Sequence, residues 1–366
     1  MGNTTSTAGK KNQRLLSVDV LRGLTVAGMI LVNNGFGESF EMLRHSAWNG
    51  MTPCDLVFPF FLFIVGVSMY LSLSKTQFQP TGPVVWKVVK RAVLLFLIGL
   101  AIHWFEMALW GSPFDFAHLR IWAVLQRIAL CYLLASLIAL YCNHRYLLPL
   151  IVGLLAVYAA ILLLGNGYVE DASVNVLAQV DLKLFGYDHL YHKGAVDPEG
   201  LVGTISGVAH VLLGFYCGRL VKTRKSIEQK CIAVFVLGTV CVVGGYLLSY
   251  GLPLNKRIWS PSYVLMTCGL ASLLLALFTC VIDIRGRKRW THFFQVFGMN
   301  ALALYICSEL LAILFKYFGI NVFIYDVLHA VIPGLKWASL AYALTFVGIH
   351  YLIGYVLWKR KIFIKL

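Results

Sequence analysis

Long apolar runs separated by short polar segments dominate the chain. Ten of these runs approach or exceed the roughly 20 residues that a helix needs to cross the hydrocarbon core of a bilayer. They are not accompanied by the ten-residue alternation of apolar and polar positions that is typical of transmembrane β-strands. The pattern therefore predicts an all-α polytopic membrane protein with about ten transmembrane helices. The expected helices cover about residues 16–35, 54–74, 87–108, 120–142, 146–165, 200–221, 230–250, 261–283, 292–318 and 336–358.

Composition supports this fold class, since 59% of the 366 residues are hydrophobic and only 13% are charged. Soluble globular chains carry about a quarter charged residues. The nine Cys lie in or near apolar runs without a CxxC pair, which favours buried, inert thiols over disulfides or zinc. We expect a single transmembrane domain over residues 16–366, preceded by a cytoplasmic tail at 1–15. The longest non-spanning stretch, 166–199, is expected to form an ordered cap on the outer side.

Positive charge is distributed asymmetrically between the two sides. If the helices alternate in direction from a cytoplasmic N-terminus, 21 of the 31 Lys and Arg fall on the cytoplasmic side and eight on the outer side. The positive-inside rule then predicts that both termini are cytoplasmic and that the segment around His45 faces outward. The basic face has two compatible interpretations, contact with anionic lipids and attraction of a polyanionic ligand such as a nucleotide cofactor. Nucleic-acid binding is not indicated, because the basic residues are spread over several loops.

The segment 31–66 holds a dense group of polar and titratable side chains beside apolar sequence. Its members are Asn33, Asn34, Glu38, Glu41, His45, Trp48, Asn49 and Asp55. Such groups are costly next to hydrocarbon unless they are used. A single histidine is commonly structural, but His45 lies at the mouth of the expected bundle and near Asp55. Because histidine titrates close to neutral pH, its functional interpretation is a general base.

Polar residues at two other places, in the first and fourth expected helices, allow two interpretations each. Asn33 and Asn34 end the first expected helix, where an amide can cap the helix or donate a hydrogen bond to a developing oxyanion. Arg127 lies inside the fourth expected helix, beside Gln126, and must face the protein interior. It could hold a phosphate or balance an internal carboxylate such as Glu309. The residues alone do not choose between these alternatives.

Simpler structural interpretations are favoured at three more places. Asp19 and Arg22 share a helix face and are expected to form an ion pair. His189 and His192 have helical spacing, but two histidines in a loop are a weak indication of a metal, and no metal is expected. The segment 197–200 has the acidic residues of a helix N-terminus, which capping alone explains.

A last polar group precedes the eighth expected helix. Asn255, Lys256 and Trp259 combine hydrogen-bonding groups with an aromatic face, and Ser262 follows them. Such a combination could line a sugar-binding site.

Several stretches of the chain, in order, resemble the heparan-α-glucosaminide N-acetyltransferase family and its bacterial relatives. The first two, SVDVLRGLTVAGMILVNN and RHSAWNGMTPCDLVFPFFLFIVGVS, are long and lie within residues 17–68. Shorter ones follow: LQRIALCYL at 125–133, HLYHKGAVDPEGLVGTI at 189–205, PLNKRIWSPSYVL at 253–265 and GMNALALY at 298–305. The resemblance extends over nearly the whole chain, which looks like the compact bacterial form.

The resemblance implies transfer of an acetyl group from cytoplasmic acetyl-CoA to the amino group of a terminal glucosamine across the membrane. It implies that His45, in the H-x-x-W-N-G motif, and Asn33, in the VN pair, are catalytic, while Asn34 departs from the aromatic residue of the lysosomal member. The expected substrate contacts are Trp48, Asn49, Asp55, Glu199, Asn255, Lys256 and Trp259. The expected CoA contacts are Arg22, Gln126, Arg127 and Asn300.

Two routes and two alternative functions remain open. His45 either takes the proton of the attacking amine or carries the acetyl group itself. The alternatives are O-acylation of an envelope glycan and transport of a sugar or anion without chemistry, although transport sites usually lie nearer the membrane midplane than His45. The expected location is a bacterial-type inner (plasma) membrane with His45 on the periplasmic side, and the expected partners are the amino sugar, acetyl-CoA and the bilayer. A homodimer is compatible with the sequence.

Overall fold

The computed structural model describes residues 15–191 and 194–364, and within these stretches it contains helices and loops but no strand. The expected all-α fold is therefore confirmed, while the expected tail at 1–15 lies almost wholly outside the described residues. The α-helices are α1 Leu16–Asn33, α2 Val57–Leu73, α3 Gly82–Leu109, α4 Val124–Tyr141, α5 Leu147–Leu164, α6 Val176–Phe185, α7 Thr204–Thr223, α8 Ile227–Ser249, α9 Pro261–Phe278, α10 Thr291–Met299, α11 Ala301–Tyr317, α12 Ile320–Val331 and α13 Leu335–Lys359.

Nine helical segments in the described part of the chain are long and apolar enough to cross a membrane. They coincide, within a few residues, with nine of the ten helices expected from hydropathy. The tenth candidate is the pair α10 and α11, which meets the length requirement only when both helices are taken together. The protein is thus an integral membrane protein, with nine or ten candidate spans among its described residues. The short helix α6 lies within the expected cap segment 166–199.

The expectation of one continuous helix over 292–318 is wrong. The chain bends by 81° between α10 and α11, and Asn300 at the break has a non-helical backbone. Its side-chain amide donates to the Ile362 carbonyl at 3.0 Å and accepts from the Ile364 N–H at 2.9 Å. Hydropathy does not reveal this break, because the polar groups that stabilise it come from a segment about 60 residues away.

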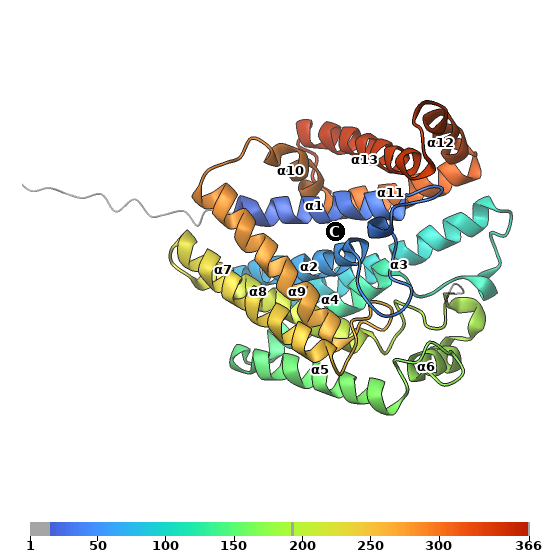
Figure 1. The fold of residues 1–366 in the computed structure, drawn as a ribbon. Helices are drawn as coiled ribbons and strands as arrows, with labels where there is room; N and C mark the ends of the chain where they lie inside the picture. Colours follow the sequence, from blue (N-terminus) through green and yellow to red (C-terminus); the bar gives the residue numbers. More distant parts are fainter. Residues whose placement is uncertain (1–14, 192–193, 365–366) are drawn as a thin grey trace, which may run out of the picture.

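Helix α1 runs between the α10–α13 group and the group that contains α2, α7 and α9 (Figure 1). It contacts α2, α9, α10, α11 and α13, so its two ends are fixed from several directions. The Asp283 carboxylate accepts hydrogen bonds from the Leu16 and Ser17 N–H groups at 3.1 and 3.2 Å and so caps its start. Its C-terminal end leads directly into the polar segment that contains His45.

Helices α2 and α7 pack especially closely, because glycines lie at their contact. A Cβ atom on Gly66 would lie 2.1 Å from the Val211 carbonyl oxygen, and one on Gly214 would lie 2.2 Å from that of Phe63. Only glycine allows the two backbones to approach this far. This contact fixes α2 relative to the rest of the bundle, and Asp55 lies in the turn Pro53–Leu56 directly before α2.

Candidate active site

The segment between α1 and α2 is ordered by short helical turns. The turn Pro53–Leu56 begins after Thr52, which forms a capping box with Asp55. The Thr52 N–H and hydroxyl both donate to Asp55 Oδ2 at 3.1 Å, and the hydroxyl also donates to the Arg44 carbonyl at 2.7 Å. This local motif holds the Asp55 carboxylate at the end of the bundle and ties the two sides of the segment together.

Asp55 orients His45. The side chain of Asp55 is 1% exposed, and its Oδ1 lies 2.7 Å from His45 Nδ1. Its Oδ2 also accepts the Ser46 N–H at 3.0 Å. A neutral imidazole has one N–H, so donation from Nδ1 to Asp55 leaves the Nε2 lone pair as the proton acceptor. The His45 side chain is 52% exposed, so the imidazole is accessible, while the buried Asp55 carboxylate fixes its orientation.

Lys256 brings a positive charge to the same carboxylate. Its Nζ lies 3.2 Å from Asp55 Oδ1 and 3.0 Å from His45 Nδ1. The loop that carries it, between α8 and α9, docks onto the His45 segment through two further contacts. The Gly50 N–H donates to the Leu254 carbonyl at 2.7 Å, and the Asn255 amide donates to Asn49 Oδ1 at 3.2 Å.

Two residues that sequence reasoning missed complete the surroundings of His45. The Cys54 sulfur is buried and lies 3.1 Å from His45 Nδ1. The Tyr263 hydroxyl donates to the Asp55 backbone carbonyl at 2.6 Å from inside α9. Both residues belong to the motifs discussed above, but neither sequence position indicates that the Cys54 sulfur lies beside His45 or that the Tyr263 hydroxyl binds the Asp55 backbone.

Asn33 faces a second cluster of polar side chains. Its amide donates to Glu309 Oε1 at 3.4 Å, and the Tyr305 hydroxyl also hydrogen-bonds to Glu309. The neighbouring Asn34 instead donates to the Ile30 carbonyl at 2.8 Å within its own helix. The two asparagines therefore differ in role. The Asn33 side chain contacts Glu309 on another helix, whereas the Asn34 side chain binds the last turn of α1.

Glu199 connects the two clusters electrostatically. Burial and the adjacent Asp197 charge raise its pKa, whereas the positive charges of Arg120, Arg127 and Lys256 oppose this rise. Its carboxylate pairs with Arg120 at 3.1 Å, and its charge also acts on Tyr305. Glu199 thus lies within electrostatic range of Lys256, next to His45, and of Tyr305, next to Asn33.

The loop before α7 differs from its sequence expectation. The segment 197–200 was expected to begin a helix, but α7 begins at Thr204. The buried Asp197 instead accepts hydrogen bonds from the Tyr191 and Glu199 N–H groups and pairs with Arg120 at 3.2 Å. Asp197 and Glu199 thus pair with the Arg120 guanidinium, and Asp197 also stabilises a turn. The composition of the segment does not distinguish this role from helix capping.

Both tryptophans expected to contact substrate are buried. Trp48 is 9% exposed, packs near Tyr158 and Ile258, and donates its indole N–H to the Tyr168 carbonyl at 2.8 Å. Trp259 is 1% exposed and packs edge-on against neighbouring aromatic rings. In this structure both side chains pack in the protein interior, and direct contact with a substrate stays a prediction.

The four expected CoA contacts do not form one cluster. Arg22 pairs with Asp19 on α1, and Asn300 has its amide engaged by the backbone near Ile362. Arg127 is buried and donates to the Pro198 and Gly200 carbonyls at 2.9 and 3.1 Å, so it neither pairs directly with Glu309 nor lies at the surface. The adjacent Gln126 is fully buried, and its amide oxygen and nitrogen have no hydrogen-bond partner in the described structure.

The loop histidines His118 and His189 do not belong to this cluster. The His189 side chain donates to the Leu119 carbonyl at 2.7 Å, while His192 lies outside the described residues. His118 forms an exposed pair with Asp115 at 2.7 Å. The Asp115 carboxylate raises the pKa of His118, mainly through the hydrogen bond between them.

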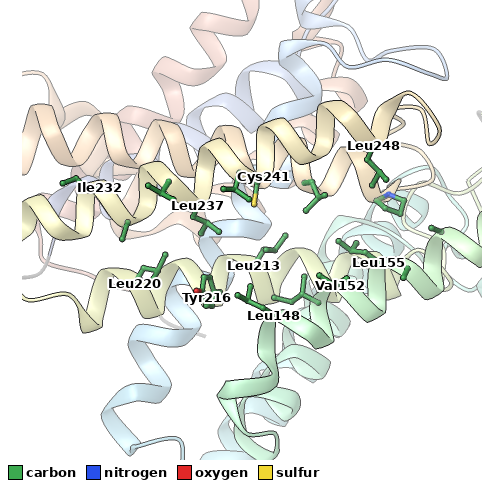
Figure 2. Close-up of a pocket in the computed structure, with 18 of the residues that line it drawn as sticks. Leu148, Val152, Leu155, Leu213, Tyr216, Leu220, Ile232, Leu237, Cys241 and Leu248 are labelled. Carbon is green, nitrogen blue, oxygen red and sulfur yellow. The ribbon is translucent and has the colours of Figure 1, made fainter.

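A wide groove of about 960 Å³ lies elsewhere, with its floor on α7 and its walls on α5 and α8 (Figure 2). Leu213, Leu155 and Leu237 are typical of its lining, and Arg224 and Gln229 lie near one end. This groove contains none of the acidic residues or histidines needed for proton transfer. Its apolar lining suits hydrocarbon chains of the bilayer and includes no residue of the cluster around His45.

The fold and this site define a polytopic helical membrane protein with an oriented His–Asp pair at one end of the bundle. Comparison with known proteins places it more narrowly. A family described as heparan-alpha-glucosaminide N-acetyltransferase, catalytic, matches residues 14–198. The chain belongs to this family, and that match contains His45, Asp55 and Asn33.

Two curated relatives agree with this assignment. The heparan-alpha-glucosaminide N-acetyltransferases of Homo sapiens and Mus musculus are each 28% identical to the chain, over 417 and 424 aligned residues. Each alignment covers 96% of this chain and 60% of the relative. The chain therefore spans about 60% of the length of the curated relatives it matches.

Proposed function

We propose that the protein is a membrane-embedded N-acetyltransferase that moves an acetyl group from acetyl-CoA to the amino group of glucosamine or a terminal glucosaminide. The observation that carries this proposal is the oriented His45–Asp55 pair, with Nδ1 and Oδ1 2.7 Å apart, inside the region matched by the family. The names of the two curated relatives support the reaction and the acceptor class.

His45 acts as the general base in the proposed reaction. An amine attacks a thioester only in its neutral form, and His45 Nε2 takes the proton that it loses. The buried Asp55 stabilises the resulting imidazolium, as a positioning residue, and Lys256 helps to fix that carboxylate. A positioned base of this kind contributes roughly 10²–10⁴-fold to a reaction rate. The thiolate of CoA then leaves and takes up a proton, for which the imidazolium is the nearest source.

Asn33 stabilises the tetrahedral intermediate in the same proposal. Its side-chain N–H groups would donate to the oxyanion that develops from the thioester carbonyl. The hydrogen bond to Glu309 orients this amide, because the carboxylate accepts one N–H and leaves the second directed elsewhere. Removing one such donor typically lowers turnover by roughly 10²–10³-fold.

The donor is proposed to approach from the basic end of the bundle, opposite His45. The exposed cluster Arg285, Arg287, Lys288 and Arg289, after α9, and the basic end of α13 suit the phosphates of CoA. Arg127, near the start of α4, contacts Gly200 and Gly203, and the adjacent Gln126 lies against Gly99 of α3. We therefore assign any contact of Gln126 and Arg127 with acetyl-CoA to its acetyl and pantetheine end rather than to its phosphates.

Acetyl transfer by purified protein tests the proposal. Acetyl-CoA and glucosamine are supplied to the protein in detergent, and the wild type is compared with His45→Ala and His118→Ala. His118 is the matched control, since it has the same 2.7 Å contact to an aspartate but lies on the surface. We expect transfer by the wild type and His118→Ala, and a loss of about 10²-fold or more in His45→Ala. Equal activity of all three would refute the role of His45.

Acceptor choice and kinetics separate the remaining alternatives. N-acetylation fails on N-acetylglucosamine, which has no free amine, whereas an O-acyltransferase accepts it. A transporter accumulates solute in liposomes and forms no acetylated product. Parallel double-reciprocal lines would favour an acetyl-His45 intermediate, and intersecting lines would favour direct transfer.

A further inference from the structure

Cys54 has no role in the proposed reaction, yet its thiol lies inside the His45 cluster. The His45 Nδ1, Cys54 Sγ and Asp55 Oδ1 atoms all lie within 4.8 Å of one another. The individual separations from Nδ1 are 3.1 Å to the sulfur and 2.7 Å to the carboxylate oxygen. Imidazole nitrogen, thiolate sulfur and carboxylate oxygen are the three donor types that zinc takes from proteins.

A cation already lies beside two of these donors. The Lys256 ammonium lies 3.0 Å from Nδ1 and 3.2 Å from Asp55 Oδ1, and its charge also acts on the Cys54 thiol. The site thus attracts positive charge independently of any metal. The Lys256 ammonium is carried on a flexible four-carbon stem, and the side chain is 19% exposed. A competing cation can therefore displace this ammonium toward solvent.

We propose that His45, Cys54 and Asp55 form a binding site for a zinc-type divalent cation, which enters in place of the Lys256 ammonium. Zinc bond lengths in a tetrahedron require donor atoms roughly 3.3–3.6 Å apart. The Nδ1 to Oδ1 separation must therefore widen by about half an ångström. Movement of the half-exposed His45 ring provides this change, while Asp55 is held by Ser46 and Thr52.

Metal binding at this site is incompatible with base catalysis. The metal binds the Nδ1 lone pair of the other imidazole tautomer, so the single imidazole hydrogen moves from Nδ1 to Nε2. The Cys54 thiol binds as a thiolate and releases its one proton to solvent. With a hydrogen on Nε2, the imidazole can no longer accept the proton of an amine there. Zinc therefore inhibits acetyl transfer, and this consequence rests on the proposed function. Magnesium and calcium, which prefer oxygen ligands, do not bind in the same way.

Spectroscopy tests the site without any reference to activity. Metal-free protein in detergent is titrated with Co²⁺ alone, and the thiolate-to-cobalt charge-transfer absorption is measured before and after Zn²⁺ is added. We expect a band that saturates at one Co²⁺ per chain and that Zn²⁺ abolishes. The band disappears in Cys54→Ala and in Cys54→Ser but persists in Cys142→Ala, which removes an exposed thiol outside the cluster.

Lys256→Met provides a test that loss of folding cannot imitate. This variant keeps the length of the side chain and removes the competing ammonium. We expect Co²⁺ to bind about tenfold more tightly, because a partly buried ion pair no longer has to be broken. Weaker or unchanged binding in Lys256→Met, no band in the wild type, or a band that persists in folded Cys54→Ala would each overturn the proposal.

Inhibition forms the second arm of the experiment. Zn²⁺ is expected to inhibit wild-type transfer reversibly, with recovery on chelation, and to require at least about tenfold more metal in Cys54→Ala. Each variant is compared with its own uninhibited rate. A Co²⁺ band in a protein that transfers no acetyl group would retain the metal site and reject the proposed function.

Discussion

At the scale of single residues, the two oxygens of Asp55 have different partners and different consequences. Oδ2 is engaged by Ser46 and Thr52, within the same short segment, whereas Oδ1 faces His45 and Lys256. The hydrogen bonds to Oδ2 fix the position of the carboxylate, and the contact of Oδ1 with Nδ1 orients the His45 imidazole. Breaking hydrogen bonds to the buried Asp55 carboxylate is costly. The backbone N–H groups of Ser46 and Thr52 that bind Asp55 therefore also determine the orientation of His45.

The neighbouring asparagines provide a matched pair of variants. We expect Asn33→Ala to lower kcat roughly 10²–10³-fold, because the oxyanion loses a donor. Asn34→Ala should change kcat by only a few-fold and mainly lower the thermal stability, since Asn34 donates to Ile30 in its own helix. Steady-state rates and melting curves of both variants in detergent distinguish these outcomes. Similar rate losses in both would contradict the assignment of the oxyanion donor to Asn33.

Asp181 makes stability depend on pH. The carboxyl is 1% exposed, and burial raises its pKa to about 6 although the Leu201 N–H donates to it. Because the folded state holds this proton more tightly, stability falls as pH rises from about 4 to about 6 and then stays lower. The cost is on the order of 3 kcal/mol, since the pKa rises by about two units at about 1.4 kcal/mol per unit.

Asp181→Asn is expected to remove this dependence while keeping the acceptor for Leu201. Melting temperatures of wild type and variant are measured in detergent between pH 4.5 and 7. Their difference should grow with pH in favour of the variant and level off above about pH 6. A constant difference across this range would show that Asp181 is ionised throughout.

At the scale of helices, the important determinants are close backbone contacts and one break. The contacts of α1 with α10 and of α2 with α7 both depend on glycine, as at Gly23, where a Cβ would lie 1.7 Å from the Phe294 carbonyl oxygen. The break at Asn300 re-aims α11 so that Glu309 meets Asn33. Helix α12, which hydropathy alone did not indicate, packs against α13 and places Tyr325 beside Phe36 in the segment after α1.

The α2–α7 contact predicts a specific sensitivity to a single methyl group. We expect Gly66→Ala to destabilise the protein by about 1–3 kcal/mol, because its Cβ would overlap the Val211 carbonyl. Gly153→Ala on α5 meets no atom within 4 Å and should be neutral or slightly stabilising, since alanine favours helix. Melting temperatures of the two variants test this. Equal behaviour of both would mean that α2 and α7 can separate at little cost.

At the scale of the whole molecule, charge divides the two ends of the bundle. The Lys and Arg clusters after α9 and α13 lie at the end opposite the His45 segment, and acidic loop residues such as Asp197 and Glu199 lie near His45. The positive-inside rule predicts that the first end is cytoplasmic. In this orientation the proposed donor and acceptor reach the site from opposite sides of the membrane.

Chemical labelling of cysteines tests this orientation. Ser112, between α3 and α4, and the native Cys142, between α4 and α5, are both exposed and lie on opposite sides of the bundle. A membrane-impermeant maleimide applied to intact cells should label Ser112→Cys in a Cys142→Ser background. Native Cys142 should react only after the membrane is opened. The reverse pattern would invert the topology and exclude outward exposure of His45.

Much of the architecture could be predicted from sequence because hydropathy and capping act over short distances. Nine helices, the polar segment after α1, and the proximity of His45 and Asp55 follow from patterns within 20 or so residues. The burial of Trp48 and Trp259 could not be predicted, because an aromatic side chain beside a polar motif suits a sugar site and a packed interior equally well. Their neighbours Tyr158 and Phe58 come from other helices.

The sequence by itself determined the membrane class, the family and the residues from which a site could be made. Only the tertiary structure decided how they are combined: Lys256 and Tyr263 meet Asp55 across more than 200 positions, Asn33 meets Glu309, and Ile362 and Ile364 hold the break at Asn300. The physical reason is that solvation acts on each segment separately. Hydrogen bonds and ion pairs between segments depend on which helix faces meet, and the packing of the whole bundle selects those faces.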